Sequence, residues 1–238
     1  MGRAYEVRKK DIQKTGAAKA KLYSMYAREI YDVAKKGGAD PNSNATLKRL
    51  IDRAKKEQVP ADIINRAIDK VNSGVDENYD RVSYEVFGPA GSTVIVECLT
   101  DNVNRSISDV KAVLNKCKCK IGVQGSVSFN YDHLCIIGVK GVNEEEVMDA
   151  IIEAGLDIED IETEDDMVVI YGSPKDSHAL KEAIEKIKPN IEFEIDEIAM
   201  LPKDKIALSG EDLELFNRLI TMLDDVDDAN HIYHNVNL

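Results

Sequence analysis

The chain has 238 residues, of which 43% are hydrophobic and 32% are charged, a balance typical of a globular protein that buries real cores in one or two domains. Its net charge of −13 is unevenly distributed, because residues 1–75 contain 17 Lys and Arg against 9 Asp and Glu, whereas the rest contains 14 against 35. The N-terminal part can therefore attract polyanions, and the remainder repels them.

No apolar run approaches the roughly 18 residues that a membrane span needs, and residues 1–21 lack the apolar middle of a secretory signal. The sequence therefore predicts a cytoplasmic protein without membrane contacts. Cysteines in that reducing compartment are expected to be free thiols. Four possible zinc ligands occur, but neither pair has the two-residue gap of zinc ribbons, so we expect buried thiols and no metal. These side chains are Cys117, Cys119, His133 and Cys135.

The first twenty residues are basic and have few apolar anchors, which predicts a segment that stays loose until a partner binds it. Three amphipathic helices are expected next: the first ends at Gly37-Gly38, the second begins after Asp40-Pro41, and the third begins at Pro60. Together they predict a small helical bundle. The cations of the first segment are Arg3, Arg8, Lys9, Lys10, Lys14 and Lys19.

Cations recur every seven residues along the first helix, which keeps them in a narrow stripe roughly opposite the apolar face. Asp32 lies in the same stripe and weakens it. Such a face either meets only solvent or binds a polyanion, and the basic segment upstream favours binding. The predicted contacts on this helix are Lys14, Lys21, Arg28 and Lys35, with Lys36 next to the last.

A hairpin is predicted after a linker at Ser73–Asn78. Residues 82–87 and 93–99 are rich in β-branched and aromatic side chains, and Gly88–Ser92 between them is typical of a tight reversal. A helix should leave the second strand at once, with Val103, Ile107, Val110 and Leu114 at helical spacing.

The start of that helix holds a polar cluster, Asn102, Asn104 and Arg105. These residues either form a capped helix start or contact a ligand at a strand end, and capping is the more general role. At the other end of the helix, Lys116, Lys118 and Lys120 form a second candidate for phosphate contacts. The alternation of Val127, Phe129 and Tyr131 then predicts a strand with one buried face.

From His133 to about Leu201 the pattern changes into a unit of its own, with the order βαββαβ. That order matches the ferredoxin-like pattern, in which two right-handed crossovers build a four-stranded antiparallel sheet. The remaining helix near Leu213–Leu223 and a strand at Ile232–Val236 are too small to bury themselves. They should return to the sheet begun at Val82.

The predicted fold class is therefore α+β with several domains. It comprises a basic helical bundle with its N-terminal segment, a middle α+β domain formed from two stretches of chain, and a ferredoxin-like domain inserted between them. The expected boundaries are 1–75 for the bundle, 79–132 plus 203–238 for the middle domain, and 133–202 for the insertion.

Catalysis has no obvious residues in this chain. No GxxxxGK[ST], HExxH, GxSxG or GxGxxG motif occurs, and Gly88–Ser92 lacks the Lys of a phosphate-binding loop. Asp224–Asp228 lacks the Gly and terminal Glu of a calcium loop, which favours a solvated acidic turn. An aromatic content of 5% and the absence of Trp argue against a stacking platform for single-stranded bases. We expect neither enzyme activity nor a cofactor.

With these residues in view, the chain resembles the YebC family, whose members are labelled probable transcriptional regulatory proteins and include a mitochondrial translational activator. The resemblance runs end to end, and the order and spacing of its motifs are specific. It rests on Gly37-Gly38 with Asp40-Pro41; on Ala54-Lys55 followed by Pro60; on Tyr84-Glu85 with Gly88-Pro89 and Gly91; on Asn102 with Asn104-Arg105; on Gly125-Ser126-Val127 and Phe129; and on Tyr233-His234-Asn235-Val236.

The resemblance implies the same three-domain architecture and no catalytic activity. Two departures from the family pattern stand out. Gly2-Arg3-Ala4-Tyr5 replaces an opening run that usually has Trp, and Lys118-Cys119 replaces a Gly-Gly pair after the middle-domain helix. The second departure removes glycines that permit close backbone approach, while it adds charge to the same loop.

Together these observations predict a non-enzymatic nucleic-acid-binding regulator of gene expression, in which the bundle and the N-terminal segment are the contact surface. The family label favours DNA and transcription. A ribosome-associated, RNA-binding translation factor is the alternative, because a basic tip on an acidic body suits RNA within a large assembly. A protein-interaction module is the rival from another class.

Overall fold

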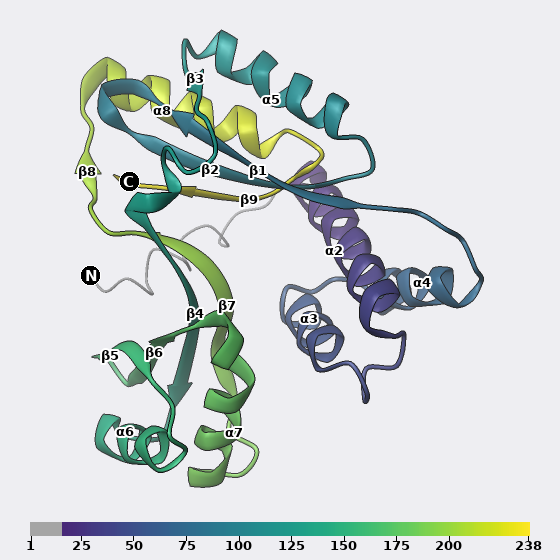
Figure 1. Cartoon of the computed structure of the whole chain (residues 1–238), viewed down its shortest axis with the longest axis vertical. Helices are drawn as coiled ribbons and strands as arrows, with labels where there is room; N and C mark the ends of the chain where they lie inside the picture. Colours follow the sequence, from purple (N-terminus) through teal and green to yellow (C-terminus); the bar gives the residue numbers. More distant parts are fainter. Residues whose placement is uncertain (1–15) are drawn as a thin grey trace. The chain divides into compact units, whose positions relative to one another are not determined.

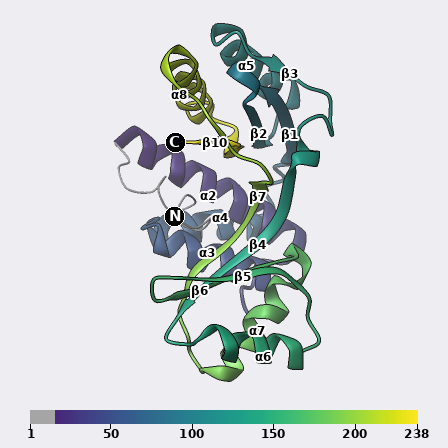
Figure 2. The ribbon, with the colours of Figure 1, turned by 90° about the vertical axis from the view of Figure 1, so that its left-hand side faces the viewer.

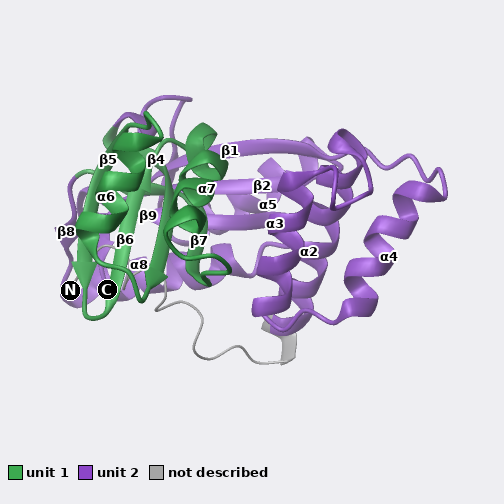
Figure 3. Ribbon diagram, turned by 90° about the horizontal axis from the view of Figure 1, so that it is seen from below, with its two compact units in different colours: residues 1–13, 130–203 green, residues 14–129, 204–238 purple. Residues whose placement is uncertain are grey.

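The computed structural model describes residues 16–238, which form an α+β protein that divides into two compact units (Figure 3). One unit consists of residues 130–203. The other combines residues 16–129 with 204–238, so its chain leaves and returns.

The larger unit begins with three helices, in keeping with the bundle expected from the sequence. Asn44 joins the first two helices, because its side chain accepts a hydrogen bond from the Leu47 backbone N–H at 3.0 Å and donates to the Gly38 carbonyl at 2.9 Å. Gly38 itself has φ +98°, a left-handed conformation that favours glycine at a helix end. Apolar side chains at helical spacing, including Tyr26, Ile30 and Leu47, form one buried core. The helices are α2 (Gly16–Gly37), α3 (Ala45–Lys56) and α4 (Ala61–Asn72).

A four-stranded antiparallel sheet with the order β3-β1-β2-β9 follows (Figure 1). The predicted hairpin is confirmed, since the two strands pair from Asp80 with Thr100 to Phe87 with Thr93. The last strand returns from the C-terminal end of the chain to the edge of β2, as expected. The strands are β1 (Asp80–Phe87), β2 (Thr93–Thr100), β3 (Lys120–Ile121) and β9 (Ala229–His234).

Helices α5 (Val103–Lys116) and α8 (Gly210–Asp224) cover one face of this sheet (Figure 1). Alternate strand residues such as Tyr84 and Val86 point to these helices and join their apolar faces in a single core. The residues between them, Glu85 and Phe87 among others, therefore point to the opposite face. A short parallel pair, β8 (Ile206–Ala207) and β10 (Val236–Asn237), completes the unit.

The smaller unit has the element order β4-α6-β5-β6-α7-β7, the order that the sequence predicts. Its strands form one antiparallel sheet arranged β5-β6-β4-β7. Both helices pack over one face of the sheet, where Cys135, Ile170 and Leu180 belong to the core (Figure 2). The bounds are β4 (Tyr131–Lys140), α6 (Glu144–Glu153), β5 (Ile158–Glu164), β6 (Met167–Gly172), α7 (Ser177–Ile187) and β7 (Phe193–Pro202).

The two ends of this unit meet. The backbone N–H of Lys203 donates to the Asn130 carbonyl at 2.9 Å, and Tyr131 pairs with Pro202 in the β4-β7 ladder. A chain that enters and leaves a unit at one point has the geometry of an insertion.

The strand predicted from Val127, Phe129 and Tyr131 is wrong. Residues 122–130 form a loop that ends in a single turn at Ser128–Asn130, and β4 starts only at Tyr131. The physical reason is Glu85, whose carboxylate accepts hydrogen bonds from the backbone N–H groups of Val127 and Ser128. Those donors are therefore not free to pair with another strand.

No helix within residues 16–238 is long and apolar enough to cross a bilayer.

Candidate nucleic-acid interface

The basic stripe of α2 is not one continuous outer face. Lys21 donates to the carbonyl of Asp224, and the Arg28 guanidinium lies 2.9 Å from the Asp228 carboxylate. Lys35 lies 2.5 Å from the Asp76 carboxylate. Lys21 and Arg28 hold α2 against the turn after α8, so neither a solvated face nor a polyanion-binding face describes these two residues. Lys35 is exposed, as is its partner Asp76 in the linker after α4.

Asp228 is the centre of this contact. Its side chain is only 3% exposed, and it also accepts a hydrogen bond from the Thr100 hydroxyl at 2.8 Å and one from Arg105 Nη2 at 3.0 Å. The expected solvated acidic turn holds for Asp224, Asp225 and Asp227, which are exposed, but not for Asp228. A buried carboxylate needs such partners, because burying it without them would lower the stability of the fold by about 3 kcal/mol or more.

Of the two interpretations of the polar cluster at the start of α5, a capped helix start or a ligand contact, the structure shows the cap. The Asn102 side chain caps the helix by accepting from the Arg105 backbone N–H at 3.1 Å. The Arg105 guanidinium bonds to Asp101 at 2.6 Å as well as to Asp228. Asn104 is exposed, and its carbonyl accepts from the Ser108 hydroxyl.

A second contact joins α2 to β9. Glu29 is 6% exposed and accepts hydrogen bonds from the Asn230 amide at 2.8 Å and from His231 Nε2 at 3.3 Å. Burial alone would raise the pKa of Glu29, but these hydrogen bonds more than offset it and lower the pKa to about 2. Glu29 therefore stays ionised at neutral pH and reinforces the position of α2.

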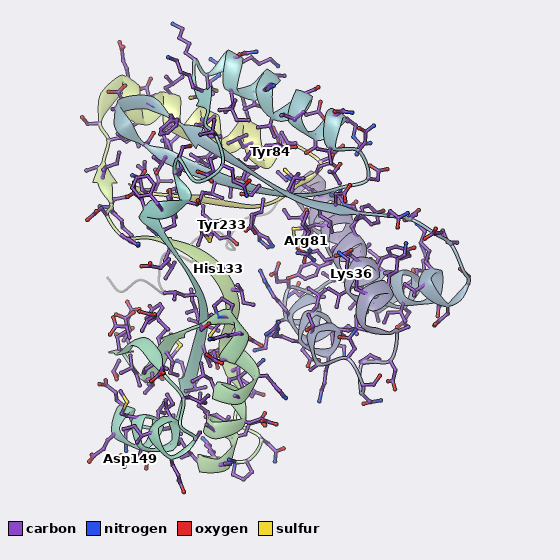
Figure 4. The ribbon with its side chains drawn as sticks, viewed as in Figure 1. Lys36, Arg81, Tyr84, His133, Asp149 and Tyr233 are labelled. Atoms are coloured by element: carbon purple, nitrogen blue, oxygen red, sulfur yellow. The ribbon has the colours of Figure 1, made fainter. Side chains whose placement is uncertain are left out.

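Asp32, the acid that interrupts the stripe, is buried between two cations. Arg81 of β1 lies 3.2 Å from its carboxylate and Lys36 lies 2.7 Å from it (Figure 4). Lys36 nonetheless keeps a 62% exposed side chain. It remains accessible to a partner, as does the exposed Lys19 at the other end of α2.

Helix α3 carries the densest positive charge of the described bundle, and the sequence interpretation missed it. Five of its 12 residues are Lys or Arg and only Asp52 is acidic. Leu47, Ile51 and Ala54 face the core, and Lys48, Lys55 and Lys56 are exposed. Arg53 is half-buried and pairs with Glu57. The sequence pattern that could have revealed this charge is the run of basic residues at the polar positions of an amphipathic helix. They are Lys48, Arg49, Arg53, Lys55 and Lys56.

The lysines after α5 form a separate basic site. Lys116, Lys118 and Lys120 are all exposed, as the sequence predicts for a surface loop. Lys118 has φ 55°, a left-handed conformation that favours glycine, at the place where the family pattern has Gly-Gly. Burial raises the pKa of the neighbouring Cys117 thiol, while the positive charges of Arg218 and Lys116 oppose this rise.

The cysteines lie in the interior of the protein. All four cysteines are buried free thiols, and burial raises the pKa of Cys119 to about 11. Within residues 16–238 no three His, Cys, Asp or Glu side chains gather as metal ligands would. The predicted N-terminal contacts Arg3, Arg8, Lys9, Lys10 and Lys14 lie outside the described residues.

Two family models cover nearly the whole chain. Residues 3–74 match the TACO1/YebC protein N-terminal domain, and residues 79–236 match the TACO1/YebC second and third domain. Among solved structures, the conserved hypothetical protein Aq1575 from Aquifex aeolicus is similar to this chain with a TM-score of 0.76 and 31% identity, over 94% of this chain and 92% of that one.

Curated relatives match along their full length. A probable transcriptional regulatory protein of Idiomarina loihiensis, IL0164, is 48% identical over 99% of both chains. A probable transcriptional regulatory protein of Marinobacter nauticus is 45% identical over 100% of this chain and 99% of its own. With both family models matched in order and relatives this similar from end to end, the chain belongs to the TACO1/YebC family.

Proposed function

We propose that this protein is a non-enzymatic regulator of gene expression that binds nucleic acid, with duplex DNA as its target. The observation that supports the proposal best is the positive charge of α3, which carries five cations, of which Lys48, Lys55 and Lys56 are exposed. Phosphate contacts from Lys and Arg provide most of the affinity for a nucleic-acid backbone. The names of the relatives, probable transcriptional regulatory proteins, support a role in transcription.

The charge distribution favours this surface over the rest of the protein. Residues 16–72 contain 12 Lys and Arg against 7 Asp and Glu, whereas residues 130–203 contain 6 against 20. A polyanion would therefore be steered to the bundle and repelled by the smaller unit. The proposed contacts are Lys48, Arg49, Arg53, Lys55, Lys56, Lys36 and Lys19, together with the predicted Arg3, Arg8, Lys9, Lys10 and Lys14.

Lys21 and Arg28 are assigned another role, whereas the exposed Lys35 remains a proposed contact. Lys21 is half-buried and donates to the Asp224 carbonyl, and the Arg28 side chain, which pairs with Asp228, is only 15% exposed. A phosphate would have to displace Asp228 to reach it. We assign Lys21 and Arg28 to the docking of α2, which fixes the direction in which the neighbouring α3 presents its charge.

A second candidate is an RNA-binding translation factor that associates with the ribosome. The strong negative charge of residues 130–203 favours it, because an acidic domain is tolerated better at one end of a large assembly than along isolated DNA. We further propose that this unit is an inserted, ferredoxin-like domain that folds by itself, and that the protein acts in the cytoplasm.

The test replaces Lys48, Lys55 and Lys56 with Gln. Fluorescence anisotropy would measure binding to a labelled 20-base-pair DNA duplex, and to the matching RNA duplex, at several salt concentrations. If the three residues contact phosphates, the slope of log affinity against log salt falls by up to about 2.7, at ~0.9 per duplex contact. Stability should change by less than about 0.5 kcal/mol, because the side chains are exposed.

The matched control changes Lys175, Lys186 and Lys188, which are exposed in the smaller unit, to Gln. This variant loses the same charge and should leave the salt slope unchanged. Equal slopes for both folded variants and the unmodified protein would refute the α3 surface. Binding to the RNA duplex or to purified ribosomes alone would support the second candidate over the first.

A further inference from the structure

The loop at residues 122–128 is held by one carboxylate. Glu85 accepts hydrogen bonds from the backbone N–H groups of Gly125 at 2.7 Å, Val127, and Ser128 at 3.0 Å. The Ser128 hydroxyl donates a further bond at 3.0 Å. Burial would raise the pKa of Glu85, but these donors outweigh it, and the pKa is lowered. The loop is therefore fixed in place by an ionised side chain that is 5% exposed.

This fixed loop lies next to two exposed phenylalanines, Phe87 of β1 and Phe129 at the end of the loop. Phe87 is 43% exposed and Phe129 is 64% exposed, although Phe is usually buried. A Cβ atom placed on Gly122 would lie 2.9 Å from the Phe87 ring, so the loop packs against that ring. Glu85 connects the two phenylalanines. It lies two residues before Phe87 on the same face of β1, and it accepts a hydrogen bond from Ser128, the residue before Phe129.

Cations border the same site. Lys120 is the cross-strand partner of Phe87, which places both side chains on one face of the sheet. Lys116 is the last residue of α5, and Lys118 lies in the turn between that helix and Lys120. No ion pair joins these three lysines to a carboxylate within residues 16–238.

We propose that Phe87, Phe129 and the surrounding cations form a second nucleic-acid contact, which binds a single-stranded segment. Unpaired bases stack on exposed aromatic rings, and lysines next to the rings meet the phosphates between those bases. The inference rests on the proposed function for the class of ligand, but it uses a surface distinct from α3. It also revises the expectation from composition, because two of the chain's four Phe residues are exposed at one place.

The positive charge around the two rings indicates which class of ligand binds there. An apolar patch alone would suit a protein partner, but three lysines with no acidic partner among the described residues favour a polyanion. Two rings supported by a loop that is bonded in place lose little entropy when a base stacks on them. Duplex DNA, whose bases are stacked on one another, cannot use the rings in this way.

The first experiment uses Phe129→Trp, because the chain contains no Trp. When the tryptophan is excited at a wavelength that tyrosine does not absorb, its fluorescence emission reports only on this loop. Titration with a 12-nucleotide oligo(dT) or oligo(rU) should quench the emission, because the indole stacks on a base. An abasic oligonucleotide of equal length presents the same phosphates without bases. No quenching, or equal quenching by the abasic strand, would overturn the proposal.

The second experiment separates the rings from the cations. Phe129→Leu keeps the side chain apolar and should weaken binding of the labelled 12-mer about fivefold or more, with the salt slope unchanged. Lys116→Gln, Lys118→Gly and Lys120→Gln together should lower the slope by up to about 2, at ~0.7 per single-strand contact. Glycine is chosen at position 118 because φ 55° suits it.

The matched control for the ring is Ile152→Ala, which removes an equally exposed apolar side chain (66%) from α6. It should leave single-strand binding unchanged. A loss of duplex binding in the α3 variant, with single-strand affinity unchanged in both the Phe129 and the lysine variants, would overturn this inference while the proposed function stands. Capture of an acidic peptide by the unmodified site, with no effect of the variants on oligonucleotides, would likewise overturn it.

Discussion

The contact between Arg28 and Asp228 should be one of the strongest pairwise interactions in the protein. The Nη1 to Oδ1 distance is 2.9 Å, and the two side chains are 15% and 3% exposed. A hydrogen bond between charged groups in such a site contributes about 1.5–3 kcal/mol. Asp228 keeps Arg105 and Thr100 when Arg28 is replaced, which limits the cost. We therefore expect Arg28→Met to lower the free energy of unfolding by about 2 kcal/mol.

A double-mutant cycle isolates the interaction. Arg28→Met and Asp228→Asn would be made singly and together, and urea unfolding would be followed by circular dichroism. Because each residue loses its partner in either single variant, the coupling energy should be about 1.5–2 kcal/mol. High salt should change it little, since buried pairs are screened weakly.

Arg66 and Asp62 on α4 supply the control in the same chain. They also form an Arg–Asp ion pair, four residues apart, but their side chains are 75% and 64% exposed. The corresponding cycle should give about 0.3–0.5 kcal/mol. If the Arg28–Asp228 coupling is no larger than this control, the contact does not hold α2 in place, and the assignment of the basic stripe to docking is refuted.

Three further predictions follow from single sites. Glu85→Gln should release the loop at residues 122–128 and raise the rate of hydrogen exchange at the Val127 and Ser128 amides. Because the pKa of Glu85 is lowered in the folded protein, its contribution to stability is present above about pH 4.3 and is lost at lower pH. The variant should lack this part of the acid dependence of stability. Asn44→Ala should cost about 1–2 kcal/mol in thermal unfolding, since it removes both the α3 cap and the bond to Gly38. Replacing residues 130–203 with a short Gly/Ser linker should leave a cooperatively folded remainder, because the ends of that segment are hydrogen-bonded to each other; a remainder without a thermal transition would contradict the insertion.

Periodicity was sufficient to predict much of the fold. The hairpin at β1 and β2, the three N-terminal helices and the βαββαβ order all depend on local patterns of apolar residues, which the structure keeps. The cap at Asn102 follows from the same local chemistry. These features are predictable because neighbours within a few residues determine them.

The partners of charged residues were not predictable in this way. The seven-residue repeat of Lys21, Arg28 and Lys35 places them on one face of a helix, but it does not say whether water, a ligand or another domain meets that face. Asp228 lies 200 residues after Arg28, and no local signal connects them. Glu85 is a similar case, since a single acid in a strand gave no indication that it organises a loop 40 residues later.

The way Glu85 holds its loop also bears on how this part of the protein can diversify. Three of its bonds go to main-chain N–H groups, which every residue except proline possesses. Side chains constrain the loop at Gly125, whose φ of +86° favours glycine, at Gly122, where a Cβ would meet the Phe87 ring, and at the buried Val127. At its exposed positions the conformation of the loop depends little on the side chains. Substitutions at the exposed Val123 and Phe129 can alter what the surface recognises without disturbing the fold, so specificity here can evolve separately from stability.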